Sequence, residues 1–224
     1  MTLRAIIFDL DGVLVHTEPI HFHSMQRILE KEGLKLTEQD YFKNYVGLND
    51  REFLKAFLDH HSHPFTDQKL KHWISEKRKG TLSQFKKEIP RVPGSDDFLK
   101  NVAQRLPVGL CTGALDEEAR MILECLDWEQ YFQVVITEKD VIHGKPHPEG
   151  YLKVLAGLSK KCKWNPSLKS NECLVIEDTQ NGIRAAKSAG MTCVAITTSQ
   201  SELYLREADL IVDRFEELIP LLLH

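Results

Sequence analysis

What this sequence lacks already excludes several kinds of protein. No apolar run approaches the roughly 18 residues that a membrane-spanning helix needs, and Arg4 interrupts the only early apolar stretch. We therefore expect neither a membrane span nor a signal peptide. Basic residues are not in excess, because lysine and arginine number 29 against 33 acidic residues, a net charge of −4. We expect a cytoplasmic protein with no general attraction to nucleic acid or to a membrane surface.

Cysteine is also scarce. The five cysteines lie far apart, form no Cys-x-x-Cys pair and mostly occur in apolar segments. This pattern favours buried free thiols in a reducing compartment over disulfides or zinc ligands. With 224 residues, of which 42% are hydrophobic, the chain has ample material for a packed core.

Short apolar runs predict the strands. Helical patterns lie between the later runs, and this alternation predicts an α/β fold with a mainly parallel sheet covered by helices on both faces. In a doubly wound sheet the strand order would be 3-2-1-4-5. The runs are residues 5–8, 108–111, 134–136, 173–176 and 193–196, with a weaker sixth at 210–212.

The interval between the first two runs is far longer than the dozen or so residues that a crossover requires. It carries helical patterns only, and Asn49 with Glu52 predicts the start of one of these helices. We therefore predict a small all-helical domain over residues 16–90. It would be inserted into an α/β domain that comprises residues 1–15 and 91–224.

Acidic and hydroxyl side chains follow three of the predicted strands. Asp9 and Asp11 follow the first, Thr112 follows the second, and Glu177 with Asp178 ends the fourth. The carboxyl ends of parallel strands form one edge, where open α/β sheets bind ligands, so these groups should converge. The Asp-Gly pair after the first strand alone would indicate no more than a turn. Several carboxylates at one point need a cation, however, and hard oxygen ligands suit Mg²⁺.

A lysine stands in a stiff segment, Gly-Lys-Pro-His-Pro at residues 144–148, that leads into a predicted helix. A lone lysine in such a turn is usually just solvated. If it is directed toward the acidic edge, Lys145 would neutralise the charge of a carboxylate or a phosphate.

Taken in order, these segments resemble the four motifs of the haloacid dehalogenase superfamily, and within it the subfamily of beta-phosphoglucomutase and small phosphatases. The resemblance spans almost the whole chain, from Phe-Asp-Leu-Asp-Gly-Val at residues 8–13 to Ile-Glu-Asp-Thr-Gln-Asn-Gly-Ile at 176–183. It implies a Rossmann-like core with a helical cap between the first two motifs. It also implies a Mg²⁺-dependent phosphatase, a monomer or weak dimer, that acts on a small phosphorylated metabolite through an aspartyl-phosphate.

The resemblance assigns catalytic roles. Asp9 would be the nucleophile and Asp11 the general acid and base. Lys145 would pair with Asp9 and with the phosphoryl oxygens. The implied metal site comprises Asp9, the backbone carbonyl of Asp11 and Asp178, with Glu177 in support. The implied phosphoryl-binding groups are Thr112 and the backbone amides of Gly113 and Ala114.

Two alternatives stay open. A hexose-phosphate mutase is one, because His21, Arg51 and the basic stretch 77–79 resemble the positions with which the mutase cap approaches the sugar phosphate. Each could also be an ordinary helix-surface group. The mutases typically continue as Ser-Ala-Ser where this chain has Thr112-Gly113-Ala114, which favours the phosphatase. The other alternative is a catalytically silent binding or regulatory protein, against which the four intact motifs argue.

Four histidines carry weaker signals. His16 stands where an aspartate is usual in this family, in the hinge between cap and core, and a neutral surface histidine is favoured there over a pH-sensitive hinge. His60, His61 and His63 fit no common zinc spacing, so we predict a solvated loop.

Overall fold

The computed structural model describes residues 3–45, 50–164 and 166–222, and the chain divides into two compact units. The first unit joins Met1–His16 to Ile89–His224, and the second comprises Thr17–Glu88. We call the second unit the cap. Asn49, which was expected to begin a cap helix, lies outside the described residues.

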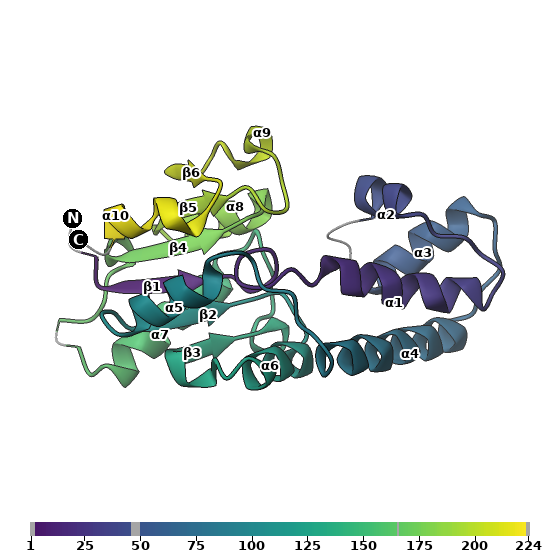
Figure 1. Ribbon diagram of the computed structural model, residues 1–224, viewed down its shortest axis with the longest axis horizontal. Coiled ribbons are helices and arrows are strands. Elements are labelled where there is room, and N and C mark those ends of the chain that lie inside the picture. Colours follow the sequence, from purple (N-terminus) through teal and green to yellow (C-terminus); the bar gives the residue numbers. More distant parts are fainter. Residues whose placement is uncertain (1–2, 46–49, 165, 223–224) are drawn as a thin grey trace. The chain divides into compact units, whose positions relative to one another are not determined.

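The first unit is built on a six-stranded parallel sheet in the order β3-β2-β1-β4-β5-β6 (Figure 1). β1 lies between β2 and β4, and all four of its residues are buried, which explains its apolar sequence without alternation. The predicted α/β fold and strand order are confirmed, with β6 added at the edge. The strands are β1 (Ala5–Phe8), β2 (Val108–Cys111), β3 (Phe132–Ile136), β4 (Cys173–Glu177), β5 (Thr192–Ile196) and β6 (Leu210–Val212).

Helices cover both faces of this sheet. Neighbouring residues of a strand point to opposite faces, so the contacts of Ile7 and Phe8 show which helices lie on each face. Ile7 packs with Tyr151 of α7 and Ile183 of α8 in one core. Phe8 points the other way and makes an edge contact with the ring of Phe98 of α5. The helices of this unit are α5 (Ser95–Ala103), α6 (Asp116–Cys125), α7 (Glu149–Lys161), α8 (Gln180–Ser188), α9 (Glu202–Leu205) and α10 (Ile219–Leu222).

The described residues of the cap form helices and no strand. α1 and α4 lie side by side (Figure 1), and the apolar faces meet in a core that includes Phe22, Phe57 and Trp73. Thr37 and Thr66 cap the helices that follow them, since each hydroxyl oxygen accepts a hydrogen bond from a first-turn backbone amide. The cap helices are α1 (Glu18–Glu30), α2 (Glu38–Asn44), α3 (Asp50–His60) and α4 (Asp67–Phe85).

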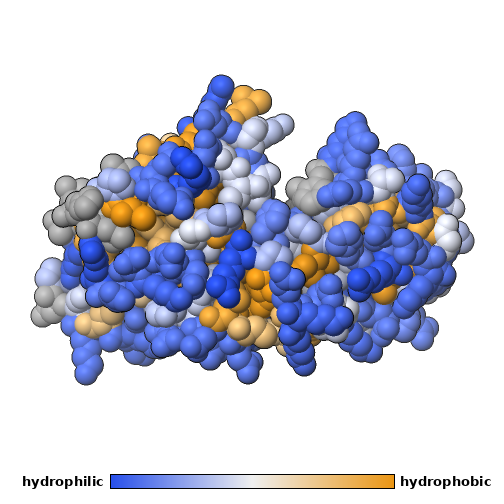
Figure 2. Space-filling model, in the orientation of Figure 1, coloured by the Kyte–Doolittle hydropathy of each residue, from blue (hydrophilic) through white to orange (hydrophobic). Residues whose placement is uncertain are grey.

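Figure 2 shows a mainly hydrophilic face on both units, with hydrophobic residues in small separate groups. Scattered exposed apolar residues of this kind are normal on protein surfaces and do not indicate a docking surface. Within the described residues, none of the helices combines the length and apolar character that crossing a membrane demands.

Candidate active site

Two carboxylates lie level with each other at the carboxyl edge of the sheet. Phe8 of β1 pairs in register with Ile176 of β4. Asp9 directly follows Phe8 and Glu177 directly follows Ile176, so the backbone places both acids at the same height. Both are buried, with 6% of Asp9 and 0% of Glu177 exposed. The strand register thus forces two acids together away from water.

Lys145 joins these two carboxylates. Its Nζ lies 2.5 Å from Asp9 Oδ1 and 2.5 Å from Glu177 Oε1. The lysine comes from the turn before α7, where Pro146 and Pro148 restrict the backbone. Burial lowers the pKa of Lys145, but the charges of Asp9 and Glu177 outweigh it and raise the pKa well above its usual value. The ammonium group therefore stays charged.

Glu177 accepts hydrogen bonds from four donors. Its Oε1 binds Lys145 and the hydroxyl of Tyr151, which is 2.5 Å away. Its Oε2 accepts from the Asp178 backbone amide at 3.1 Å and from Thr179 Oγ1 at 3.2 Å. Tyr151 is fully buried, and its ring centroid is 5.3 Å from Lys145 Nζ, a cation–π distance. Sequence reasoning missed Tyr151, whose only signal is its place on the helix that follows Lys145.

A group of buried carboxylates lies around this lysine. One oxygen each of Asp9, Glu177 and Asp178 lies within 4.8 Å of the others. Burial raises the pKa of Asp9 to about 7 against the attraction of Lys145, and the charges of Glu177 and Asp11 add to the increase. Burial, with the charges of Glu177 and Asp9, also raises the pKa of Asp178 well above its usual value. A bound cation would favour the ionised form of both acids.

One oxygen of Asp178 offers a position for such a cation. Asp178 is 1% exposed, and its Oδ1 is buried with no hydrogen-bond partner within the described part of the chain. A buried polar atom without a partner costs free energy. Carboxylate oxygens are the ligands that Mg²⁺ prefers, so the residues at this edge fit a Mg²⁺ ion.

The Asp-Gly turn after β1 packs directly against Asp178. A Cβ added to Gly12 would lie 1.8 Å from Asp178 Oδ2 and 2.4 Å from Ser199 Oγ. Gly12 also has a φ of +79°, a conformation that favours glycine. Its carbonyl accepts a hydrogen bond from Thr198, and its neighbour Asp11 is partly buried in the same turn. The loop after β5 is therefore part of the site, which no sequence pattern indicated.

The segment after β2 supplies a buried hydroxyl. Thr112 is 5% exposed, and its Oγ1 accepts a hydrogen bond from the Ala114 backbone amide at 3.0 Å. A hydroxyl that accepts one hydrogen bond can still donate one. Gly113 between them has open space where a side chain would be. If the Ala114 amide is to bind phosphate as expected, its hydrogen bond to Thr112 Oγ1 must first break.

Gly182 of α8 should be required beneath Glu177, since an added Cβ would lie 1.9 Å from the Glu177 carboxyl carbon. We expect Gly182→Ala to lower the free energy of unfolding by about 1–3 kcal/mol in urea titrations, as overpacking does, although alanine favours helix. Gly113→Ala is the matched control, because, apart from its two chain neighbours, none of the described residues lies within 4 Å of its added Cβ. Equal losses in the two variants would contradict this account.

In the cap, His21 of α1 contacts a buried lysine. Lys77 is 4% exposed, and its Nζ lies 2.8 Å from His21 Nδ1 and 2.9 Å from Asp50 Oδ1. Burial and the Lys77 charge lower the pKa of His21 to about 3, so the ring is neutral and accepts the hydrogen bond. In the sequence, the basic run at residues 77–79 resembles a solvated helix face, so the buried position of Lys77 is not apparent from it. Because all three residues of the run are basic, the sequence does not distinguish the buried Lys77 from the exposed Lys79.

The other singled-out residues lie on the surface. Arg51 Nη2 pairs with Asp67 Oδ1 at 2.7 Å, and both side chains are substantially exposed. His16 is exposed. His60 and His61 are exposed at the end of α3, and the groups of described residues that could jointly hold a metal do not include them.

The fold and the site define an α/β enzyme in which buried carboxylates and one lysine are gathered at the carboxyl edge of a parallel sheet. Residues 6–196 match the family model of haloacid dehalogenase-like hydrolases, and the chain belongs to this family. The family resemblance found in the sequence, and with it the prediction of an enzyme, is confirmed.

Relatives match most of the chain. A phosphorylated carbohydrates phosphatase of Thermotoga maritima is 34% identical over 189 residues, which is 84% of this chain and 82% of that protein. The beta-phosphoglucomutase of Bacillus subtilis is 27% identical over 227 residues, 99% of this chain and 94% of that one. The structure of CbbY from Rhodobacter sphaeroides in complex with phosphate matches with a TM-score of 0.83 and 22% identity, covering 97% and 96% of the two chains. This last likeness supports the fold.

Proposed function

We propose that this protein is a Mg²⁺-dependent phosphatase of small phosphorylated carbohydrates. The observation that carries the proposal is the contact of Lys145 with Asp9, beside an Asp178 oxygen that has no hydrogen-bond partner among the described residues. It brings together a nucleophile, a positive charge and a metal ligand, which are the groups that phosphoryl transfer needs. The phosphorylated carbohydrates phosphatase of Thermotoga maritima supports the class of substrate.

In the proposed reaction a carboxylate oxygen of Asp9 forms a bond to phosphorus, and the bond from phosphorus to the leaving alcohol oxygen breaks. Asp11 donates a proton to that oxygen, and then removes a proton from the water that attacks the aspartyl-phosphate. The water oxygen forms a bond to phosphorus while the bond between phosphorus and the Asp9 oxygen breaks, which releases inorganic phosphate and regenerates the Asp9 carboxylate.

The phosphoryl group carries negative charge throughout, so its neighbours must supply positive charge and hydrogen-bond donors. Lys145 supplies the charge and is already fixed in place by Glu177. The Thr112 hydroxyl and the backbone amides of Gly113 and Ala114 supply donors.

When bound, Mg²⁺ neutralises further negative charge on the transferring group. Asp9, the backbone carbonyl of Asp11 and Asp178 would hold it. Glu177 is occupied by four donors, so we assign it to positioning Lys145 and to the support of the metal site rather than to direct ligation.

The cap is proposed to select the substrate. The cap groups that would approach the carbohydrate are Arg51 and His21, which burial and the Lys77 charge keep neutral. The cytoplasmic location and the monomeric or weakly dimeric state stay predictions.

A sugar-phosphate mutase is the second candidate, since the beta-phosphoglucomutase relative covers almost the entire chain. Against it, the chain has Gly113 and Ala114 after Thr112 where mutases typically carry alanine and then serine. Mutases also carry an asparagine shortly after this segment, whereas this chain has Asp116. Its Oδ2 pairs with Lys139 Nζ at 2.5 Å. We therefore favour water over a sugar hydroxyl as the phosphoryl acceptor.

The deciding experiment incubates the protein with Mg²⁺, beta-glucose 1-phosphate and a trace of glucose 1,6-bisphosphate. A parallel panel of carbohydrate phosphates is assayed for phosphate release. We expect free phosphate from one or more compounds of the panel and no glucose 6-phosphate. Rapid formation of glucose 6-phosphate would identify a mutase, and no turnover of any compound would overturn both candidates.

A further inference from the structure

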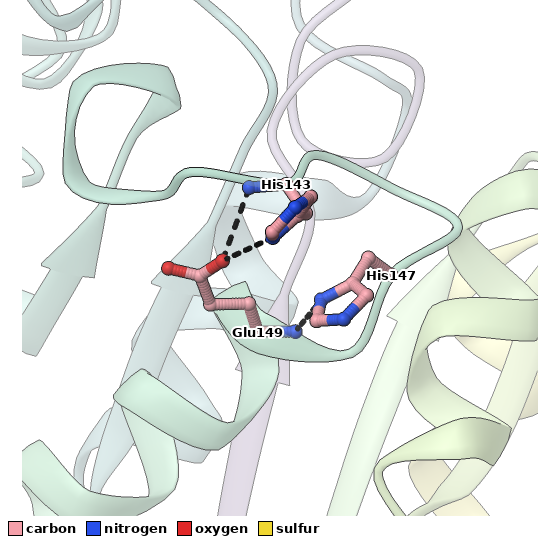
Figure 3. A group of neighbouring side chains, drawn as sticks. All are labelled: His143, His147 and Glu149. Carbon is pink, nitrogen blue, oxygen red and sulfur yellow. Dashed lines mark hydrogen bonds and ion pairs between the residues drawn. The ribbon is translucent and has the colours of Figure 1, made fainter.

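We propose a second metal site, for Zn²⁺, formed by His143, His147 and Glu149 (Figure 3). One ligand atom from each of the three side chains lies within 4.8 Å of the others. The two histidines stand two residues before and two residues after Lys145. The site therefore spans the turn that presents this lysine, yet the phosphatase mechanism uses none of its three side chains.

Glu149 is the fixed member of the group. Its Oε2 accepts a hydrogen bond from the His143 backbone amide at 3.0 Å, and its Oε1 accepts from the Ile142 amide at 3.1 Å and from Lys153 at 2.6 Å. These bonds hold the carboxylate toward the His143 ring, whose Nδ1 is 3.4 Å from Oε2 (Figure 3). An ionised carboxylate oxygen has more than one lone pair, so Oε2 can keep its amide and still bind a metal.

The two histidines are the adjustable members. Their ring centroids are 4.8 Å apart, and both side chains are exposed. His147 Nδ1 accepts a hydrogen bond of 3.2 Å from the Glu149 backbone amide (Figure 3). Rotation of the His147 ring would break this hydrogen bond and free a ring nitrogen to bind a metal. Because the position is exposed, a water molecule can then accept the hydrogen bond from the Glu149 amide. Closing to zinc–ligand distances of about 2.0–2.2 Å thus requires side-chain rotation and no change of fold.

The donor set decides which metal binds. Two imidazoles and one carboxylate suit Zn²⁺ and neighbouring transition metals, whereas Mg²⁺ prefers oxygen ligands alone. The positive end of α7 opposes a cation at its first turn, and the Glu149 carboxylate offsets it. The two metal sites of this chain would therefore differ in selectivity, with Mg²⁺ among the acids near Asp9 and Zn²⁺ at the turn.

Zinc at this turn would act on Lys145. Ligation of His143 and His147 ties together the two sides of the turn, which already has a hydrogen bond from the His147 amide to the Gly144 carbonyl. A cavity of about 300 Å³ is lined by Thr112, Lys145 and both histidines, so the ion would also add charge beside the phosphoryl site. We expect slower turnover with zinc bound. This consequence rests on the proposed phosphatase function, whereas zinc binding does not.

The test is a zinc titration against a chromophoric chelator, with excess Mg²⁺ to saturate the acidic site. The wild-type protein should take up one tight equivalent, and His143→Ala and His147→Ala should each weaken it at least about tenfold. His60→Ala is the matched control, because His60 is also exposed beside a second histidine, with ring centroids 5.1 Å apart. Thermal unfolding of each variant verifies that it is folded.

The proposal is overturned if His60→Ala weakens zinc uptake as much as His143→Ala, or if neither His143→Ala nor His147→Ala alters it. In a parallel phosphatase assay, zinc should slow the wild type more than His143→Ala. Equal inhibition of both would overturn the effect on Lys145 and leave the binding result standing. If no phosphatase substrate is found, the chelator titration still decides the metal site, so the two proposals fail separately.

Discussion

The Asp9→Asn variant should lose phosphatase turnover almost completely. Asparagine has nearly the same size and shape, but its neutral amide is a poor nucleophile toward phosphorus. We expect kcat to fall on the order of 10⁴-fold or more, the scale seen when a covalent nucleophile is removed. The measurement is phosphate release from an aryl phosphate in the presence of Mg²⁺.

Asp97→Asn provides the matched control. It makes the same chemical change at an exposed carboxylate of α5, and it should retain wild-type turnover. Acid quenching during turnover should trap protein-bound phosphate in the wild type and none in Asp9→Asn. Undiminished turnover by Asp9→Asn would refute the nucleophile assignment and with it the proposed mechanism.

Mg²⁺ should stabilise the folded protein increasingly as the pH rises toward neutrality. The pKa of Asp9 is raised from 3.8 to about 7 in the folded protein, and that of Asp178 is also raised. Between pH 3.8 and about 7, the folded state therefore keeps a proton on Asp9 that the unfolded state has released. Without a divalent ion, stability should therefore fall as the pH rises from about 4 to about 7. Mg²⁺ replaces the missing positive charge and should reverse this loss.

Thermal unfolding with and without Mg²⁺ at several pH values measures this effect. With Mg²⁺ about 100-fold above its Kd, the stabilisation is about 2.7 kcal/mol, or roughly 5–10 °C for a chain of this length. Asp178→Asn should remove most of the increase, while Asp97→Asn should keep it. An increase of the same size at pH 5 and pH 8, or one that survives in Asp178→Asn, would place Mg²⁺ elsewhere.

Most of the sheet could be predicted because its strands are short, apolar and bounded by polar residues, as at residues 173–176. β3 shows where this pattern fails, since it begins at Phe132 rather than at the expected residue 134. Gln133 interrupts the apolar run, and its side-chain oxygen accepts a hydrogen bond from the Val108 amide at 2.6 Å. A polar residue that completes an irregular part of the ladder is invisible to a pattern based on hydrophobicity.

The candidate site also contains both residues that the sequence could single out and residues that it could not. Asp9, Lys145 and Asp178 could be singled out because their chemistry and their places after strands or in a stiff turn both point to one edge. Tyr151 and Ser199 could not, because their contacts depend on how helix and loop pack in three dimensions. His143 and His147 gave no signal either, whereas the histidine-rich run near the end of α3 resembled a metal site more closely. His143 and His147 lie close to Glu149 in the fold, whereas the groups of described residues that could hold a metal do not include the histidines near the end of α3.

The central position of β1 also determines the order in which the enzyme can be assembled. Ile6 pairs with Val108 on one side and with Leu174 on the other, so this strand cannot complete its pairing until the chain has been synthesised beyond Leu174. Such distant pairing slows folding because the intervening chain must be ordered before the contacts form. Until then Ala5–Phe8 is an unpaired apolar strand that can associate with other chains. Asp9 can therefore take its place beside Glu177 only after the residues between them have been synthesised and ordered.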